Sequence, residues 1–86
     1  MNYKQLKTLK FLIKTGSYTK TAEILNYTQS NISQLENELE NSLFINHNKS
    51  IMQTDFLKNI MPLINDYIDV YEQIIIFQNM RIVEEK

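Results

Sequence analysis

Apolar residues near the start of the chain recur every three or four positions, which is the spacing that places side chains on one face of an α-helix. This first apolar face consists of Leu6, Leu9, Leu12 and Ile13. Asn2 can cap the start of such a helix with its side-chain oxygen, and Gly16 suits its end because glycine tolerates a left-handed backbone. The pattern therefore predicts a helix between residues 2 and 16.

Two further short helices are expected next, separated by a tight turn. Ser17 or Thr19 can cap the second helix and Thr28 the third, because hydroxyl oxygens accept hydrogen bonds from open backbone amides. Asn26 falls in the turn, and asparagine tolerates the left-handed backbone that such turns often require. The second helix is expected to bury Tyr18, Ala22 and Leu25, and the third Ile32, Leu35, Leu39 and Leu43. The residues expected to pack where the two helices meet are Ala22, Leu25, Tyr27, Ile32 and Leu35, which predicts a helix-turn-helix.

Two short β-strands are expected after the third helix. Leu43-Phe44-Ile45 and Ser50-Ile51-Met52 flank a polar segment, which predicts a hairpin with a polar tip at Asn46-His47-Asn48-Lys49. Three helices followed by such a hairpin form a winged helix-turn-helix. The expected fold class is therefore mainly α, with residues 1–54 as one small winged domain.

A long amphipathic helix is expected to begin at Thr54 and Asp55. Its apolar stripe comprises Phe56, Leu57, Ile60, Met61, Ile64, Tyr67, Ile68, Tyr71, Ile74 and Ile75, continued by Ile76 and Phe77. Between Thr54 and Met80 the helix would span about 40 Å, which exceeds the body of so small a domain. We expect residues 55–86 to form a linker and dimerisation helix, bent at Pro62, that pairs with a second copy of the chain. The predicted dimer contacts are Ile64, Tyr67, Ile68, Tyr71, Ile74 and Ile75.

Composition excludes several classes of function. The chain has no cysteine and a single histidine, so neither a thiolate metal site nor a histidine-based catalytic pair is available. We expect no metal, no cofactor and no enzymatic activity. No run reaches the roughly 18 apolar residues of a membrane span, and the start lacks the apolar core of a secretory signal. A cytoplasmic protein without membrane contact is therefore expected.

Charge is distributed unevenly along the chain. The net charge of −1 by itself disfavours a nucleic-acid binder, because lysine and arginine must neutralise phosphates. Between residues 1 and 34, however, five lysines stand against one glutamate. The acidic residues come later, first as Glu36, Glu38 and Glu40 and then through the last third. This asymmetry favours a nucleic-acid-binding first half, although solvated helix faces would show the same lysines.

Between residues 5 and 62 the chain contains a series of short motifs at characteristic distances from one another. They are Gln5-Leu6, Gly16-Ser17-Tyr18-Thr19-Lys20-Thr21-Ala22-Glu23, Leu25, Thr28-Gln29-Ser30, Ile32-Ser33, Leu35-Glu36-Asn37-Glu38-Leu39 and Leu43-Phe44, followed by Thr54 and Pro62. With these motifs the chain resembles the N-terminal winged helix-turn-helix domain and linker helix of LysR-type transcriptional regulators. The resemblance covers nearly the whole chain, and its combined spacing is more specific than a single helix-turn-helix pattern.

The resemblance implies a small sequence-specific regulator of transcription that binds double-stranded DNA. Phosphate contacts are implied at the start of the second helix, at Ser17, Thr19 and Lys20. Major-groove contacts are implied for the recognition helix, at Thr28, Gln29, Ser30, Asn31, Ser33 and Gln34. Backbone or minor-groove contacts are implied for the wing, at Asn46, His47, Asn48 and Lys49. Glutamine and asparagine favour adenine when they bind it with two hydrogen bonds. Capping or turn formation remains the alternative role for each of these residues.

Three departures from the family pattern alter the expected function. The chain has no room for the effector domain that normally follows the linker helix, so a ligand-responsive switch of the usual kind is not expected. About four residues are missing between Gln34 and Leu35, which shortens the recognition helix by about one turn, or 6 Å. The basic residues usual after Ser33 and along the wing are mostly replaced, with Gln34 and Ser50 in two of these places. Weaker DNA affinity and a weaker salt dependence should follow.

These departures leave a second class of function open. A helix-turn-helix can be reused to bind protein, as an inhibitor or as a heterodimerising antagonist. Its acidic surface at Glu36, Glu38 and Glu40 would then meet a basic partner, such as a nucleic-acid enzyme or a related regulator. DNA binding and protein binding thus remain the two functions to be separated.

Overall fold

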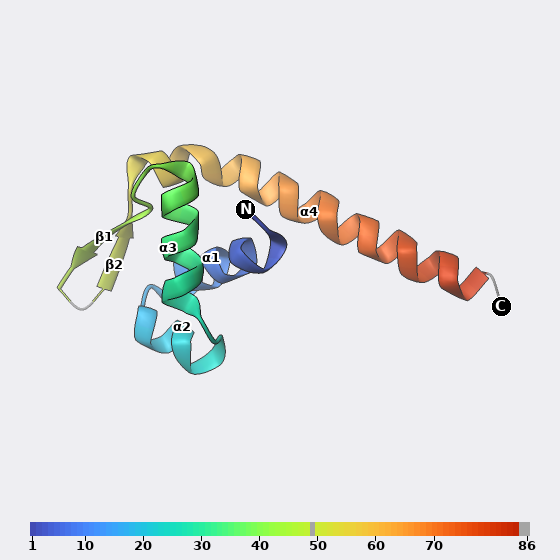
Figure 1. Ribbon diagram of the computed structural model, residues 1–86, viewed down its shortest axis with the longest axis horizontal. Coiled ribbons are helices and arrows are strands. Elements are labelled where there is room, and N and C mark those ends of the chain that lie inside the picture. The colour runs from blue at the N-terminus through green and yellow to red at the C-terminus, as the bar shows by residue number, and fades with distance from the viewer. Residues whose placement is uncertain (49, 85–86) are drawn as a thin grey trace.

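The computed structural model describes residues 1–48 and 50–84, and describes side chains up to residue 80. In order, its elements are α1 (Tyr3–Thr15), α2 (Tyr18–Ile24), α3 (Thr28–Leu39), β1 (Phe44–His47), β2 (Ser50–Gln53) and α4 (Asp55–Glu84). The first three helices form a body, the hairpin projects from one side, and α4 extends away on the other side (Figure 1). This confirms the expected winged helix-turn-helix with a long C-terminal helix.

Both ends of α1 are set by local hydrogen bonds, as predicted. The Asn2 side chain accepts a hydrogen bond from the Gln5 amide at 2.8 Å, while the Gln5 side chain accepts one from the Asn2 amide at 3.1 Å. This reciprocal pair satisfies two amides that the helix leaves open. Gly16 ends the helix with a φ of 68°, which is the left-handed conformation that glycine adopts at little cost.

Helix α2 packs through a different residue from the one expected. Ser17 caps its start, since the Ser17 hydroxyl accepts a hydrogen bond from the Lys20 amide at 3.3 Å. Thr21 is completely buried, and Ala22 is exposed, so the expected inward position of Ala22 is wrong. The hydroxyl of Thr21 lies 2.6 Å from that of Thr15, which satisfies its polar group and allows its burial against α1.

The turn between α2 and α3 also differs in detail from the prediction. Tyr27, not Asn26, has the left-handed backbone, with a φ of 63°. Its ring is 71% exposed instead of packed between the helices, and the Lys4 ammonium lies 5.7 Å from the ring centroid. Thr28 is not the cap of α3, because its hydroxyl donates backward to the Leu25 carbonyl at 3.0 Å. Helix α3 therefore begins without a side-chain cap.

A single apolar core joins the winged body to the first half of α4. It consists of Leu6, Leu9, Leu12, Ile32, Leu35, Leu43, Leu57, Ile64 and Ile68. Ile64 and Ile68 were expected to remain free for a second chain, but they are buried within this one. Tyr71 stacks on Tyr3, with the ring centroids 4.3 Å apart. Helix α4 is therefore anchored along α1 before it leaves the body.

Helix α4 runs without interruption from Asp55 to Glu84 and contains Pro62. The Thr54 hydroxyl accepts a hydrogen bond from the Leu57 amide at 3.2 Å, as a helix cap does. In Figure 1 the first turns of α4 arch over the C-terminal end of α3, and the remainder projects from the body. Thirty residues correspond to a helix of about 45 Å.

Candidate nucleic-acid interface

Helix α3 presents one uncharged polar face to solvent. We call it the reading face, and it consists of Gln29, Ser30, Ser33, Gln34 and Asn37, all of them exposed. The opposite side of α3 holds Ile32 and Leu35 in the core. A helix 12 residues long spans about 18 Å, which suits a major groove about 12 Å wide. The reading face offers amide and hydroxyl groups, which are the groups that hydrogen-bond to base edges.

Two residues predicted to contact DNA are instead buried beneath this face. Asn31 is only 8% exposed, and its side-chain amide donates to the Thr8 hydroxyl at 3.1 Å. Thr28 is 2% exposed. Burial leaves both side chains little surface for a direct contact with DNA, so we omit them from the proposed contact residues. Sequence pattern placed them wrongly because a polar residue in a helix is usually exposed, whereas these two satisfy their polar groups inside the body.

Gln34 is exposed but already tied to the body. Its side-chain carbonyl accepts a hydrogen bond from the Gln5 side-chain amide at 2.7 Å. Gln5 also closes the cap of α1, so a single side chain connects the first turn of α1 to the reading face. This contact fixes the orientation of the Gln34 side chain, whose carbonyl oxygen already has a partner.

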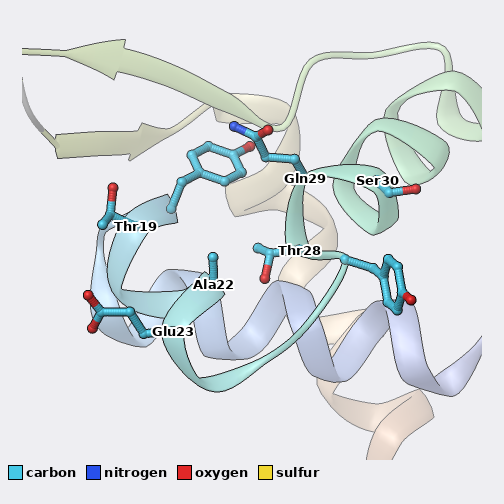
Figure 2. A pocket seen from close by; sticks show the side chains of 8 residues that line it. Thr19, Ala22, Glu23, Thr28, Gln29 and Ser30 are labelled. Atoms are coloured by element: carbon cyan, nitrogen blue, oxygen red, sulfur yellow. The ribbon is translucent and has the colours of Figure 1, made fainter.

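An open pocket of about 600 Å³ separates α2 from the start of α3. Figure 2 shows Thr19 and Glu23 on one side of it, Gln29 on the other, and Ala22 and Thr28 between them. The exposed methyl group of Ala22 leaves this pocket unfilled. Hydroxyl and amide donors on its rim suit a phosphate oxygen, whereas the carboxylate of Glu23 repels one.

The wing is longer in its strands and shorter in its tip than expected. Strands β1 and β2 pair antiparallel from Phe44 opposite Gln53 to His47 opposite Ser50. Asn46 and His47 thus belong to a strand, and Asn48 begins the turn with a φ of 56°. All three are exposed. The predicted contact at Lys49 lies outside the described residues.

Hydrogen bonds fix the base of the wing against α3. The Glu36 carboxylate accepts a hydrogen bond from the Leu43 amide at 2.8 Å, and the Thr54 hydroxyl donates to the Ser42 carbonyl at 2.8 Å. Tyr18 of α2 also meets Phe44 of β1 edge-to-face, with centroids 6.4 Å apart. Burial raises the pKa of Tyr18, and the nearby Glu36 carboxylate adds to this, so the phenol keeps its proton. The wing and the two helices therefore form one preorganised surface.

The sequence pattern of the family described as "bacterial regulatory helix-turn-helix protein, lysR family" matches residues 3–56. The chain belongs to the LysR family. It is 40% identical over 58 residues to the HTH-type transcriptional regulator GltR of Bacillus subtilis (strain 168), which covers 63% of this chain and 20% of GltR. It is 35% identical over 75 residues to the HTH-type transcriptional regulator YtlI of the same organism, which covers 84% of this chain and 24% of YtlI. The chain thus spans about a quarter or less of these relatives, and no solved structure matches it closely.

The lysines of this LysR-family chain do not gather at the reading face. Lys7, Lys10 and Lys14 of α1 border a pocket that they share with Ile68 and Glu72 of α4. Lys7 also pairs with Glu72, with 3.7 Å between nitrogen and oxygen. Lys20 is exposed in α2. Most of the positive charge in the first half therefore faces α4, which corrects the expectation that this charge supplies the nucleic-acid surface.

The three carboxylates considered for a basic protein partner have separate surroundings. Glu36 is half-buried and holds the wing through Leu43. Glu38 pairs with the amino group of Met1. Glu40 follows the last turn of α3 with a left-handed φ of 54°. Since Glu36 and Glu38 also lie about 200° apart around the helix, these residues do not form one acidic surface.

Sequence reasoning missed Asn37 as a member of the reading face. In the sequence, Asn37 stands between Glu36 and Glu38, so the acidic residues around it obscure its place on a polar face. Its spacing from Gln29 and Ser33, four residues at each step, is the signal that places it on their side of the helix.

Among the residues that the structure describes, no helix is long and apolar enough to cross a membrane. That same part of the chain contains no group of histidine, aspartate and glutamate arranged to hold a metal ion.

Proposed function

We propose that this chain is a sequence-specific DNA-binding regulator of transcription. The observation that supports the proposal is the uncharged reading face of α3, which is exposed on a winged scaffold of the LysR family. Amide and hydroxyl side chains in this position suit base edges better than they suit a protein partner, because DNA supplies dense arrays of donors and acceptors. Both relatives described above are named as transcriptional regulators, which agrees with this assignment.

In the proposed complex, α3 lies in the major groove and Gln29, Ser30 and Ser33 meet base edges. Lys20, Thr19 and the cap residue Ser17 meet phosphates at the start of α2. The wing residues Asn46, His47 and Asn48 lie along the neighbouring backbone, with Lys49 predicted to join them. Because Lys20 is the one basic residue of α2 and α3, few counterions are released on binding. Binding should therefore depend only weakly on salt.

A direct binding measurement tests this proposal. Fluorescence polarisation would compare DNA from around the protein's own gene with shuffled DNA of the same composition, at two salt concentrations. We expect tighter binding to at least one native segment, and we expect the preference to persist at the higher salt concentration. Equal affinity for native and shuffled DNA at both concentrations would contradict sequence-specific binding.

We further propose that two copies pair through α4. On the side turned away from the body, this helix presents an exposed outer stripe of Leu63, Tyr67, Val70, Ile74 and Phe77. These residues alternate spacings of four and three, as in a coiled coil. The inner stripe of Leu57, Met61, Ile64 and Ile68 has the same spacing but packs on the body. The proposed dimer contacts therefore leave out the buried Ile64 and Ile68 and keep Tyr67 and Ile74. Tyr71 and Ile75 are partly covered on the side of Tyr3 and stay predicted contacts.

The size of this apolar stripe supports a second copy as its occupant. Exposed apolar side chains in a continuous patch mark interaction sites in soluble proteins. A stripe with heptad spacing is complementary to itself, so two α4 helices related by a two-fold axis bury their apolar stripes against each other. The linker helix of a related regulator would fit the same stripe. Such a heterodimer is the second candidate function.

Solution mass distinguishes these arrangements. Analytical ultracentrifugation of the wild type should show a dimer at micromolar concentration, and Val70→Asp should give a folded monomer. Asn65→Asp is the matched control, because it adds the same charge at an exposed position away from the outer stripe. A wild type that stays monomeric over the whole concentration range would overturn the homodimer.

A further inference from the structure

We propose that Asn37 is an additional base-reading residue, and that it selects an adenine-bearing base pair at the end of the site contacted by the last turn of α3. This inference rests on the proposed DNA-binding function. It adds a residue and a base preference to that function.

Asn37 completes a ladder of polar side chains along α3. Gln29, Ser33 and Asn37 are four residues apart, so each step rises about 6 Å and turns only about 40° around the helix. The ladder therefore spans about 12 Å on one side of α3. Successive base pairs are about 3.4 Å apart, so this length covers three to four base-pair steps. Helix α3 ends at Leu39, which leaves Asn37 in its last turn.

The side-chain amide of Asn37 is exposed and not used within the described part of the chain. Two other asparagines, one within α3 and one just after it, have partners, since Asn31 donates to Thr8 and Asn41 donates to the Leu39 carbonyl at 3.0 Å. Asn37 takes part in none of the side-chain hydrogen bonds found among residues 1–48 and 50–80, whose side chains the structure describes. A free amide at this position does not need to lose an internal contact before it binds a base.

The charges beside Asn37 support the same assignment. Its neighbours are Glu36, which bonds to the Leu43 amide, and Glu38, which pairs with the amino group of Met1. Both carboxylates therefore have intramolecular partners on either side of the ladder. Asn37, the uncharged polar residue between these two glutamates, lies on the side of α3 that continues the reading face. A carboxylate there would face DNA phosphates, whereas an amide does not repel them.

The chemistry of the amide gives the expected base. An asparagine side chain both donates and accepts a hydrogen bond, and it matches the N7 acceptor and the N6 amino donor of adenine in the major groove. Guanine offers two acceptors at the same edge, so one of the two hydrogen bonds is lost. Asn37 should therefore favour adenine over guanine at one position of the site.

Selection from a random DNA library, read by sequencing, tests the inference. The wild type, Asn37→Ala, Gln29→Ala and the distant control Asn65→Ala would be compared, with circular dichroism as a check of folding. The expected result for Asn37→Ala is a loss of adenine preference of about tenfold at one position. Preference at the position that depends on Gln29 should persist, and Asn65→Ala should match the wild type.

A modified base adds a second measurement. Replacing adenine by 7-deazaadenine at the Asn37-dependent position removes the N7 acceptor, which should weaken wild-type binding and leave Asn37→Ala unaffected. If Asn37→Ala retained every preference while Gln29→Ala lost one, the role of Asn37 would be overturned and DNA binding would stand. If the wild type selected no sequence at all, the proposed function itself would fail.

Discussion

The side-chain amide of Asn31 donates to the Thr8 hydroxyl across 3.1 Å, at the buried junction of α1 and α3. The Thr8 hydroxyl in turn donates to the Lys4 carbonyl at 2.9 Å. This chain of hydrogen bonds crosses beneath the reading face and sets the position of α3 against α1. Asn31 therefore holds α3 in place, and the proposed base contacts are left to its exposed residues, such as Ser30 and Ser33.

Removing the acceptor of this hydrogen bond should destabilise the fold. Thr8→Val keeps the shape of the side chain but leaves a buried amide without a partner, which costs about 1–3 kcal/mol of unfolding free energy. Gln29→Ala, at an exposed position of the same helix, should change stability by less than about 0.5 kcal/mol. Urea denaturation measures both. Equal stability of Thr8→Val and the wild type would show that the hydrogen bond between Asn31 and Thr8 does not stabilise the fold.

The course of the backbone was largely predictable from the sequence, because apolar spacing and capping residues act locally. Asn2, Gly16, Ser17 and Thr54 mark helix ends in both the prediction and the structure. Packing choices between neighbouring residues were not predictable in the same way. Thr21 and Ala22 differ by only 100° around α2 and are both small, so the apolar pattern did not reveal which one faces α1.

The faces of α4 posed the same difficulty at a larger scale. Its inner and outer stripes have the same spacing and similar hydrophobicity, so periodicity alone does not show which one packs on the body. The structure separates them, because Ile68 meets the core while Val70 stays exposed. The burial of Asn31 depends on its contact with Thr8, 23 residues away, which no local pattern contains.

Lys20 and Lys10 should have different effects on DNA binding, although each carries one positive charge. Lys20 lies in α2 beside the proposed phosphate contacts, whereas Lys10 borders α4. Lys20→Ala should weaken binding to all sequences about equally and lower the salt slope by about one unit. Lys10→Ala should leave the slope unchanged. Polarisation titrations at several salt concentrations measure both slopes, and equal losses would place DNA against α1 as well.

The end of α3 offers a stabilising substitution. Glu40 has a φ of 54°, a left-handed conformation that costs a residue with a side chain about 1–2 kcal/mol. Glu40→Gly removes this strain, although glycine loses more conformational entropy on folding than glutamate does. The net effect should be an unfolding free energy raised by about 1 kcal/mol. Glu38→Gly is the comparison inside the helix, and it should lower stability by about 0.5 kcal/mol through helix propensity, besides removing the pair with the amino group of Met1. Thermal melting compares them, and a decrease for both variants would argue against strain at Glu40.

The contact between α1 and α4 should respond to pH in two opposite ranges. The Tyr3 hydroxyl donates to the Glu72 carboxylate at 2.6 Å. This hydrogen bond raises the pKa of Tyr3 above its ordinary 10.0 and lowers the pKa of Glu72 below its ordinary 4.5. A lowered carboxyl pKa stabilises the fold above the unfolded pKa and loses that effect as pH falls through the folded pKa. A raised phenol pKa stabilises the fold below 10.0 and loses that effect as pH rises through the folded value.

Comparison with Tyr3→Phe isolates this contact. The stability difference between the wild type and Tyr3→Phe should be constant between about pH 5 and pH 9, because neither group titrates in that range. It should shrink in more acidic solution as Glu72 is protonated, and in more alkaline solution as Tyr3 ionises. Urea denaturation across pH measures the difference, and the difference in phenolate absorbance between the two proteins follows Tyr3 itself. A Tyr3 that ionises at or below its ordinary pKa would show that the hydrogen bond to Glu72 does not form in solution.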